Sequence, residues 1–198
     1  TAGSSPISTP ASCATRSPAP APPMGPSDPG TRLFSPAQAF ESAAHLQLQG
    51  RLAEAEQLYE AVLDLDRHHP GALHNLAMIR AEQGRLGEAA SLLRHAVDRH
   101  PGDAAAQVGF GGVLQAMGRH ADALAPFERA ATLDPDLAPA HYGLASALLA
   151  LGRAADALER LDRALALEPG FAEALSAKGS ALQALGRAAE AVAWHERA

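Results

Sequence analysis

From Pro36 onward, apolar residues recur at helical spacing in two stretches of every 34-residue block. In the block 70–103, the first stretch holds Leu73, Leu76, Ala77 and Ile79, and the second holds Ala89, Leu92, Leu93, Ala96 and Val97. Spacings of three and four residues place these side chains on one face of an α-helix. The pattern therefore predicts two antiparallel helices per block, over block positions 1–14 and 17–30.

A glycine recurs at intervals of 34 residues, between the two predicted helices of each block. The series is Gly50, Gly84, Gly118, Gly152 and Gly186. Arginine follows each glycine, an acidic residue comes three positions after the arginine, and alanine comes next. Glycine adopts the left-handed conformation that ends many helices without steric cost. We expect the alanine where the helices cross, and the arginine and acid as a solvated pair at a helix start.

Counting from Pro36, the repeats cover 36–69, 70–103, 104–137, 138–171 and 172–198, and the last stops after 27 residues. Proline at position 32, as in Pro101, Pro135 and Pro169, is expected to end the second helix. Pro126 falls inside a predicted second helix, where it removes a backbone hydrogen bond and should bend the helix. A period of this length indicates a repeat architecture.

Residues 1–35 differ from the rest, with eight of the chain's 15 prolines and seven serines. Such a segment buries too little apolar surface to offset its ordering entropy, so we expect a disordered leader. The leader lacks the pattern of a secretory signal, which makes a cytoplasmic location the default expectation. Met24 is a candidate for the true start of the protein.

Composition narrows the function classes further. The 198 residues include 47 alanines, 15 arginines and a single lysine, and the net charge of −6 argues against a nucleic-acid partner. No apolar run is long enough for a membrane span. Cys13 is the only cysteine, which excludes an internal disulfide.

The repeated positions resemble the tetratricopeptide repeat family over about 163 residues, from 36 to 198. The small position of the first helix reads Ala43, Ala77, Gly111, Ala145 and Gly179, and the bulky position of the second reads Tyr59, Leu93, Phe127, Leu161 and His195. The first repeat departs from the pattern at Ser42, Val62 and Arg67. The resemblance implies an all-α, right-handed superhelical solenoid of antiparallel helix pairs, with the first helices lining a concave face.

That resemblance places partner contacts at positions 2, 5, 6, 9, 12 and 13 of each first helix. The residues predicted to form a peptide-binding groove are His74, Asn75, Met78, Gln115, Tyr142, Ser146 and Gln183. Gly109, Gly112 and Gly143 are expected to let the partner backbone approach closely. Among these positions three acids, Glu41, Glu82 and Glu173, occur without any lysine or arginine. Of the basic and asparagine positions that clamp acidic chaperone tails in one subfamily, only Asn75 matches, so we predict no binding of such tails.

Catalytic chemistry finds little support in the sequence. Nine histidines are scattered over different repeat positions, and His195 with Glu196 begins a zinc signature that the chain does not complete. Gly109, Gly111 and Gly112 lack the strand and the final glycine of a phosphate loop. We therefore expect no catalytic, cofactor-binding or metal-ligating residues in this chain.

Three functional hypotheses remain open. The first is a non-catalytic module that binds a segment of another protein. The second is the docking array of a larger enzyme, such as a bacterial glycosyltransferase or sulfotransferase, although position 6 has only Asn75 of the asparagine ladder found in protein O-linked N-acetylglucosamine transferases. The third is self-assembly, because the last helix leaves Val192 and Trp194 without a following helix. We expect the natural protein to continue beyond Ala198.

Overall fold

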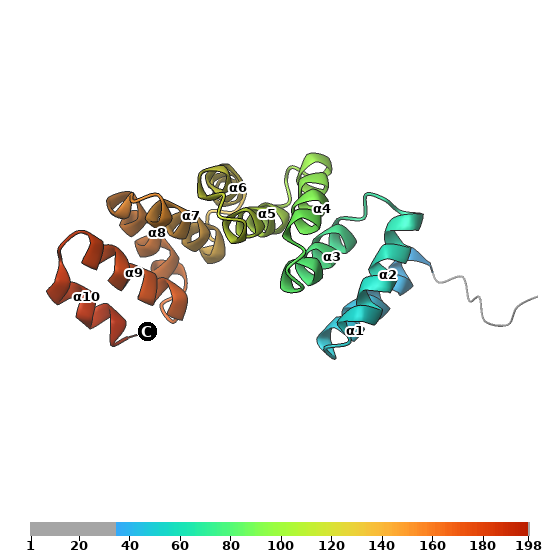
Figure 1. The fold of residues 1–198 in the computed structure, drawn as a ribbon, viewed down its shortest axis with the longest axis horizontal. Coiled ribbons are helices and arrows are strands. Elements are labelled where there is room, and N and C mark those ends of the chain that lie inside the picture. The colour runs from blue at the N-terminus through green and yellow to red at the C-terminus, as the bar shows by residue number, and fades with distance from the viewer. Residues whose placement is uncertain (1–34, 198) are drawn as a thin grey trace, which may run out of the picture. The chain divides into compact units, whose positions relative to one another are not determined.

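A computed structural model of the chain describes residues 35–197, which form ten α-helices and no β-strand (Figure 1). The helices are α1 (Pro36–Leu48), α2 (Leu52–Leu65), α3 (Pro70–Glu82), α4 (Leu86–Arg99), α5 (Ala104–Ala116), α6 (His120–Leu133), α7 (Ala138–Ala150), α8 (Ala154–Leu167), α9 (Ala172–Ala184) and α10 (Ala188–His195). The predicted leader, with Cys13 and Met24, lies outside the described residues apart from Ser35, which caps the start of α1.

The helices pack in chain order. Each odd-numbered helix contacts the even-numbered helix after it, and α2, α4, α6 and α8 each contact the next odd-numbered helix. The odd-numbered helices from α3 to α9 also contact one another directly. The predicted all-α solenoid of antiparallel helix pairs is therefore confirmed, and its inner row consists of first helices.

The turn within each pair is built from the recurring glycine and arginine. All five glycines have a positive φ between 74° and 77°, as predicted. In the turn after α3, Gly84 donates its N–H to the Ala81 carbonyl and Arg85 donates to the Arg80 carbonyl, at 3.0 and 2.8 Å. Arg85 then begins α4 without a side-chain cap, and its guanidinium binds Glu88 instead. The same exposed pair occurs in all five repeats, as expected.

The second helices end just before position 32. Helices α4, α6 and α8 end two residues before Pro101, Pro135 and Pro169. Helix α2 ends at the equivalent residue although Arg67 replaces the proline, so proline reinforces this end without being required for it. Helix α6 continues through Pro126 and, with 14 residues, is as long as α4 and α8.

Alanine at the helix crossing packs as predicted. Ala55, Ala89, Ala123 and Ala157 are each fully buried. The bulky residue four positions later fills the space between repeats, as Tyr59, Leu93, Phe127 and Leu161 show. The core therefore consists of small residues at crossings and one large side chain per junction.

The core is unequal along the array. One large cluster of buried side chains extends from Leu114 of α5 to Ala181 of α9, and another extends from Ala39 of α1 to Ile79 of α3. Between them lie only two small clusters that join α3, α4 and α5. Within residues 35–197, every helix is too short or too polar to cross a bilayer.

Candidate functional site

Two adjoining hollows lie between the first helices of the second and third repeats. Their volumes are about 290 and about 460 Å³, and both are lined by Met78, Val108 and Gly109. We call the combined surface the inner groove. Its lining residues are His74, Met78, Ala81, Glu82, Leu86, Ala105, Val108, Gly109, Gly112, Val113, Ala116, Leu137 and Pro139.

The inner groove is apolar with one carboxylate. Glu82, exposed at the end of α3, is its only lining side chain with a formal charge when the histidine is neutral. Met78 is half-buried at the centre and has an unbranched side chain that adapts to different occupants. Gly112 leaves the floor open, since a Cβ added there would meet nothing within 4 Å. This arrangement suits apolar side chains of a bound segment.

His74 forms one wall of the groove and behaves as an uncharged group. Burial lowers the pKa of its imidazole below the usual 6.5, and the smaller effect of Asp103 raises it. The buried Nδ1 has no hydrogen-bond partner among the described residues. His74 therefore contributes a mainly apolar ring surface at neutral pH.

Asn75 is partly committed to the core. Its side-chain nitrogen donates to the hydroxyl of Tyr59 at 2.9 Å, and that hydroxyl donates to Gln47 Oε1 at 2.9 Å. This chain of hydrogen bonds links α1, α2 and α3, and it satisfies the polar end of a fully buried tyrosine. This bond leaves the side-chain oxygen and the second N–H of Asn75 for the predicted contact with a partner.

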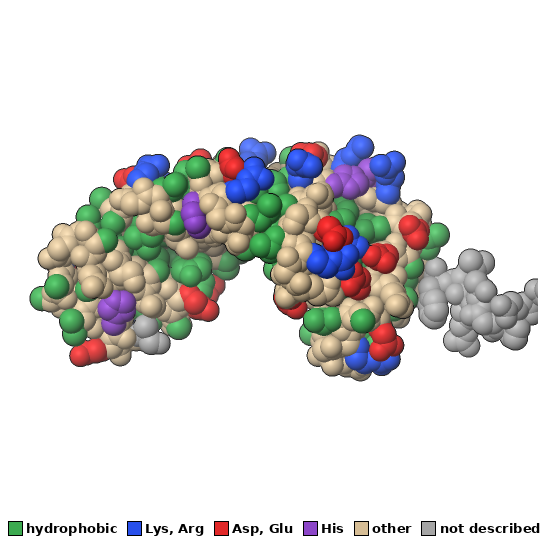
Figure 2. Space-filling view, viewed as in Figure 1, with side chains coloured by type: hydrophobic (Ala, Val, Ile, Leu, Met, Phe, Trp, Pro, Cys, Tyr) green, Lys and Arg blue, Asp and Glu red, His purple; other side chains and the backbone are tan. Residues whose placement is uncertain are grey.

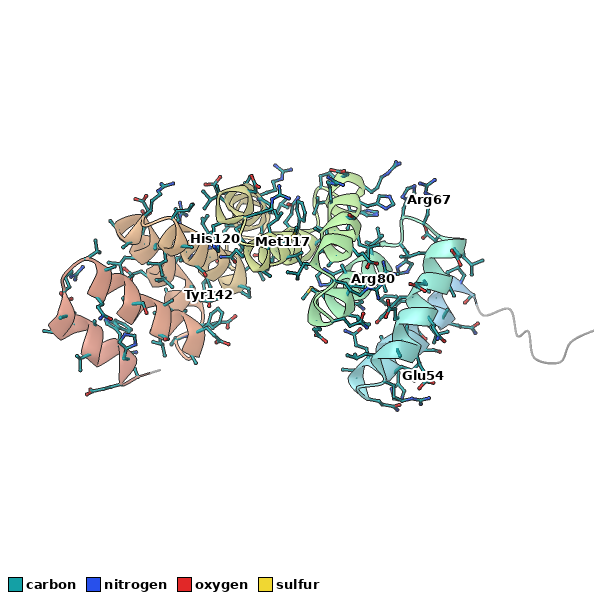
Figure 3. The ribbon with its side chains drawn as sticks, in the orientation of Figure 1. Glu54, Arg67, Arg80, Met117, His120 and Tyr142 are labelled. Carbon is teal, nitrogen blue, oxygen red and sulfur yellow. The ribbon has the colours of Figure 1, made fainter. Side chains whose placement is uncertain are left out.

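Tyr142 lies in a separate hollow of about 380 Å³ between α7 and α9, whose lining also includes Glu173, Ser176 and Ser180 (Figure 3). Its ring packs on Phe171 with centroids 4.9 Å apart. Burial, and to a lesser extent Glu173, raises the pKa of the Tyr142 phenol. The hydroxyl is therefore a neutral hydrogen-bonding group beside an acid, which favours a polar or basic contact.

The remaining predicted residues line neither the inner groove nor the hollow around Tyr142. Gln115 and Ser146 are half-buried, and Gln183 is exposed. Conversely, the prediction missed Val108, and it missed Leu86, Leu137 and Pro139. Leu86 begins a second helix and Leu137 lies in a loop, so both fall outside the six first-helix positions considered. Val108 and Pro139 occupy two of those positions, 5 and 2, but were not selected.

Two of the three glycines expected to admit a partner backbone also have a packing role. A Cβ at Gly143 would overlap the Phe127 ring, and a Cβ at Gly109 would lie 3.1 Å from His74 and 3.3 Å from Leu93. Gly143 makes room for a core side chain, and Gly109 makes room for His74 and Leu93 while it also lines the inner groove. The close approach of a partner backbone to these glycines stays a prediction, and Gly112 has the most open space for it.

The histidines do not build a metal centre in the described part of the chain, where no group of three or more potential ligands converges. His68 Nδ1 and His95 Nε2 lie 2.9 Å apart, and His100 Nε2 lies 2.8 Å from the carbonyl of His68. These contacts tie the loop before α3 to α4. They show pairing of histidines that sequence positions alone did not indicate.

Comparisons with known proteins agree with this architecture. Tetratricopeptide repeat models match residues 46–109, 80–125, 114–178 and 172–197. A comparison with curated protein sequences gave no match.

Among solved structures, the MamA protein is similar with a TM-score of 0.71 and 22% identity, over 82% of this chain and 88% of that chain. YrrB, described as a TPR protein with an unusual peptide-binding site, gives 0.68 and 19%, over 82% and 84%. A thermophilic TPR protein of Thermus thermophilus gives 0.68 and 24%, over 82% and 89%. These similarities confirm the predicted right-handed solenoid.

Proposed function

The chain belongs to the tetratricopeptide repeat family, and from that premise we propose that it binds a segment of another protein in the inner groove. The observation that carries the proposal is the continuous apolar lining across α3 and α5, open at Gly112. Burying apolar side chains of a partner there removes their surface from water at roughly 25 cal/mol per Å². The peptide-binding site named for YrrB supports the same class of ligand.

The charge of the groove restricts the partner. Glu82 is exposed beside the apolar lining, and no arginine or lysine lines the groove. An acidic tail would meet repulsion without a clamp of basic side chains, so the predicted failure to bind acidic chaperone tails is retained here. The cytoplasmic location likewise stays a prediction.

The test blocks the groove without disturbing the core. Gly112→Trp places an indole over the floor, where a side chain has free space. Peptides selected from a random library on the wild-type chain should bind this variant at least about tenfold more weakly, a loss of about 1.4 kcal/mol. Isothermal titration calorimetry measures the affinities, and circular dichroism verifies that helicity is unchanged.

A matched control adds the same side chain elsewhere. Ala155→Trp adds an indole on the exposed surface of α8 and should leave peptide binding unchanged. Tyr142→Ala examines the hollow between α7 and α9 separately. Equal peptide affinity for wild type and Gly112→Trp would contradict the proposed groove.

A further inference from the structure

A second hollow surface lies between α4 and α6, with Phe110 and Leu114 of α5 as its floor. It comprises two adjoining hollows of about 550 and about 270 Å³ that share Phe110, Leu114 and Arg119. We call it the outer crevice. None of its lining residues lines the inner groove. Figure 2 shows apolar surface gathered between α4 and α6.

The crevice exists because two side chains at this junction are unusually small. Ala90 occupies repeat position 21, where the other repeats have Glu56, Leu124, Leu158 and Val192. Pro126 occupies position 23, where the others have Leu58, Leu92, Arg160 and Trp194. At the preceding junction the corresponding space is filled by the contact of Glu56 with Arg80 and Arg85. Helices α4 and α6 therefore leave Phe110 partly exposed, above the buried Leu114.

An amide that water still reaches faces this apolar space. Gln107 lines the larger hollow and has a relative exposure of 8% as a residue. Its side-chain amide is not one of the fully buried polar groups that lack a partner, so it is free to bond a ligand in the hollow. In addition, Pro126 has no N–H for the carbonyl of Asp122, four residues earlier on the same wall. A ligand with peptide groups would satisfy such donors and acceptors.

The charges around the crevice favour an anion. Arg94 and Arg119 line it against a single acid, Asp122. Arg119 is paired with Asp122 at 2.7 Å, whereas Arg94 forms no ion pair with the described residues. A carboxylate on the ligand would complement Arg94.

We propose that the outer crevice is a second docking site, which binds a protein segment presenting an apolar side chain beside a carboxylate. The apolar side chain packs on Phe110 and Leu114, its peptide groups bond Gln107, and the carboxylate pairs with Arg94. This site prefers the opposite charge to the inner groove, so the array would hold two different segments at once. The proposal does not depend on the inner groove being occupied.

The experiment uses the full chain and two blocked tripeptides. The probes are acetyl-leucyl-glutamyl-leucine amide and its glutaminyl counterpart, which differ only in charge. Nuclear magnetic resonance follows the side-chain amide of Gln107 during titration. We expect the glutamyl peptide to shift this signal with a dissociation constant of about 1 mM or tighter. The glutaminyl peptide should bind at least about threefold more weakly.

Three variants locate the site. Ala90→Leu fills the crevice with a residue that the equivalent positions 124 and 158 already hold, and it should weaken binding at least about tenfold. Gln107→Leu removes the amide and should weaken binding by about threefold to tenfold, read from the Phe110 ring signals. Arg94→Gln should abolish the discrimination between the two peptides. Ala155→Leu, exposed on α8, is the control and should change nothing.

Several results would overturn the proposal. Absence of any shift at millimolar peptide, or an equal shift in Ala90→Leu, would exclude the site. Equal affinity of both peptides would exclude the proposed pairing of a ligand carboxylate with Arg94. Shifts that appear with protein concentration alone and vanish in Ala90→Leu would assign the crevice to a second copy of this chain. Gly112→Trp should leave all these shifts intact, which separates this test from that of the inner groove.

Discussion

The side chain of Phe127 restricts one position in each of two other helices, α5 and α7, to glycine. Its ring lies where a Cβ of Gly111 would come within 2.8 Å and a Cβ of Gly143 would come closer still. Leu161, at the equivalent position, lies in a junction with alanine at both corresponding sites, Ala145 and Ala177. Glycine at 111 and 143 is therefore a packing requirement of an aromatic ring, and it costs the helices some stability.

The two kinds of helical glycine should respond in opposite directions to alanine. Gly112→Ala adds a methyl group to open space and should raise the free energy of unfolding by about 1 kcal/mol. Gly143→Ala clashes with Phe127 and should lower it by about 1–3 kcal/mol. Urea unfolding followed by circular dichroism measures both. Rescue of Gly143→Ala by Phe127→Leu would confirm the cause, and a stabilising Gly143→Ala would contradict it.

Stability should fall on acidification because of His74. Its pKa is lowered in the folded chain, so the folded state binds a proton less readily than the unfolded state. The resulting stability is present above the usual value of 6.5 and is lost below it, as the pH falls to the lowered pKa of the folded state. Unfolding midpoints at about pH 7.5 and about pH 5.5 should differ less in His74→Leu than in wild type. Equal pH-dependent differences in midpoint for His74→Leu and wild type would refute this role. Some dependence of stability on pH should remain in the variant, because burial also lowers the pKa of His68.

At the scale of helices, the junction of α2, α3 and α4 is held by a network of charges. Arg80 contacts Glu56 at 3.3 Å, Glu60 at 2.5 Å and Glu88 at 3.1 Å, and Arg85 contacts Glu56 at 2.6 Å (Figure 3). The side chains of Arg80 and Glu56 are each only 15% exposed. Such a connected and partly desolvated set is worth more than separate surface pairs.

Arg80→Ala should lower the free energy of unfolding by about 2 kcal/mol, because it removes three charged contacts across the junction. Arg153→Ala breaks an exposed pair with Asp156 and should change it by less than about 0.5 kcal/mol. Thermal or urea unfolding at low and high salt measures both effects. Equal losses in the two variants would show that the network adds nothing.

The bounds of α1–α9 were predictable from sequence to within one residue, because glycine, arginine and alanine recur at fixed positions in every unit. Helix α10 ends at His195, although the predicted second helix also covers residues 196 and 197. The sequence also indicated His74 and Met78 in the groove, since their positions repeat the family pattern. It did not indicate that Gly143 faces Phe127 or that Asn75 donates a hydrogen bond to Tyr59, because both contacts join side chains of different repeats. The outer crevice depends on Ala90 and Pro126 being small together, which becomes visible only when neighbouring helices are placed.

At the scale of the whole array, the two large core clusters lie on either side of the junction of α4 with α5. Only small clusters join them, near the partly exposed ring of Phe110. The stability of a repeat array depends on the stability of each repeat and on the interfaces between neighbouring repeats. We therefore expect the junction of α4 with α5 to be the weakest connection among the interior repeats. The last helix is different, since Val192 is exposed while Trp194 is half-buried beneath Lys178 and Arg197.

Ala90→Leu should make helices α1–α4 and helices α5–α8 open with more similar free energies. Native-state hydrogen exchange should give α1–α4 and α5–α8 different free energies of opening in wild type. Filling the crevice should raise the lower value by about 1–2 kcal/mol and bring the two closer. Ala155→Leu should leave both values unchanged. Equal protection of both parts in wild type would contradict the weak junction.

The pairing of Phe127 with glycines from two successive repeats has a consequence for engineering by module exchange. A fusion boundary drawn after residue 137, at the end of a sequence repeat, would transplant the aromatic ring without Gly143, and almost any other host residue there would collide with it. The transferable cassette is longer than the sequence period. It starts at the first helix of the unit that holds the ring, which supplies Gly111, and finishes after the first helix of the following unit, which supplies Gly143. Libraries shuffled on that frame should keep each ring with its cavity.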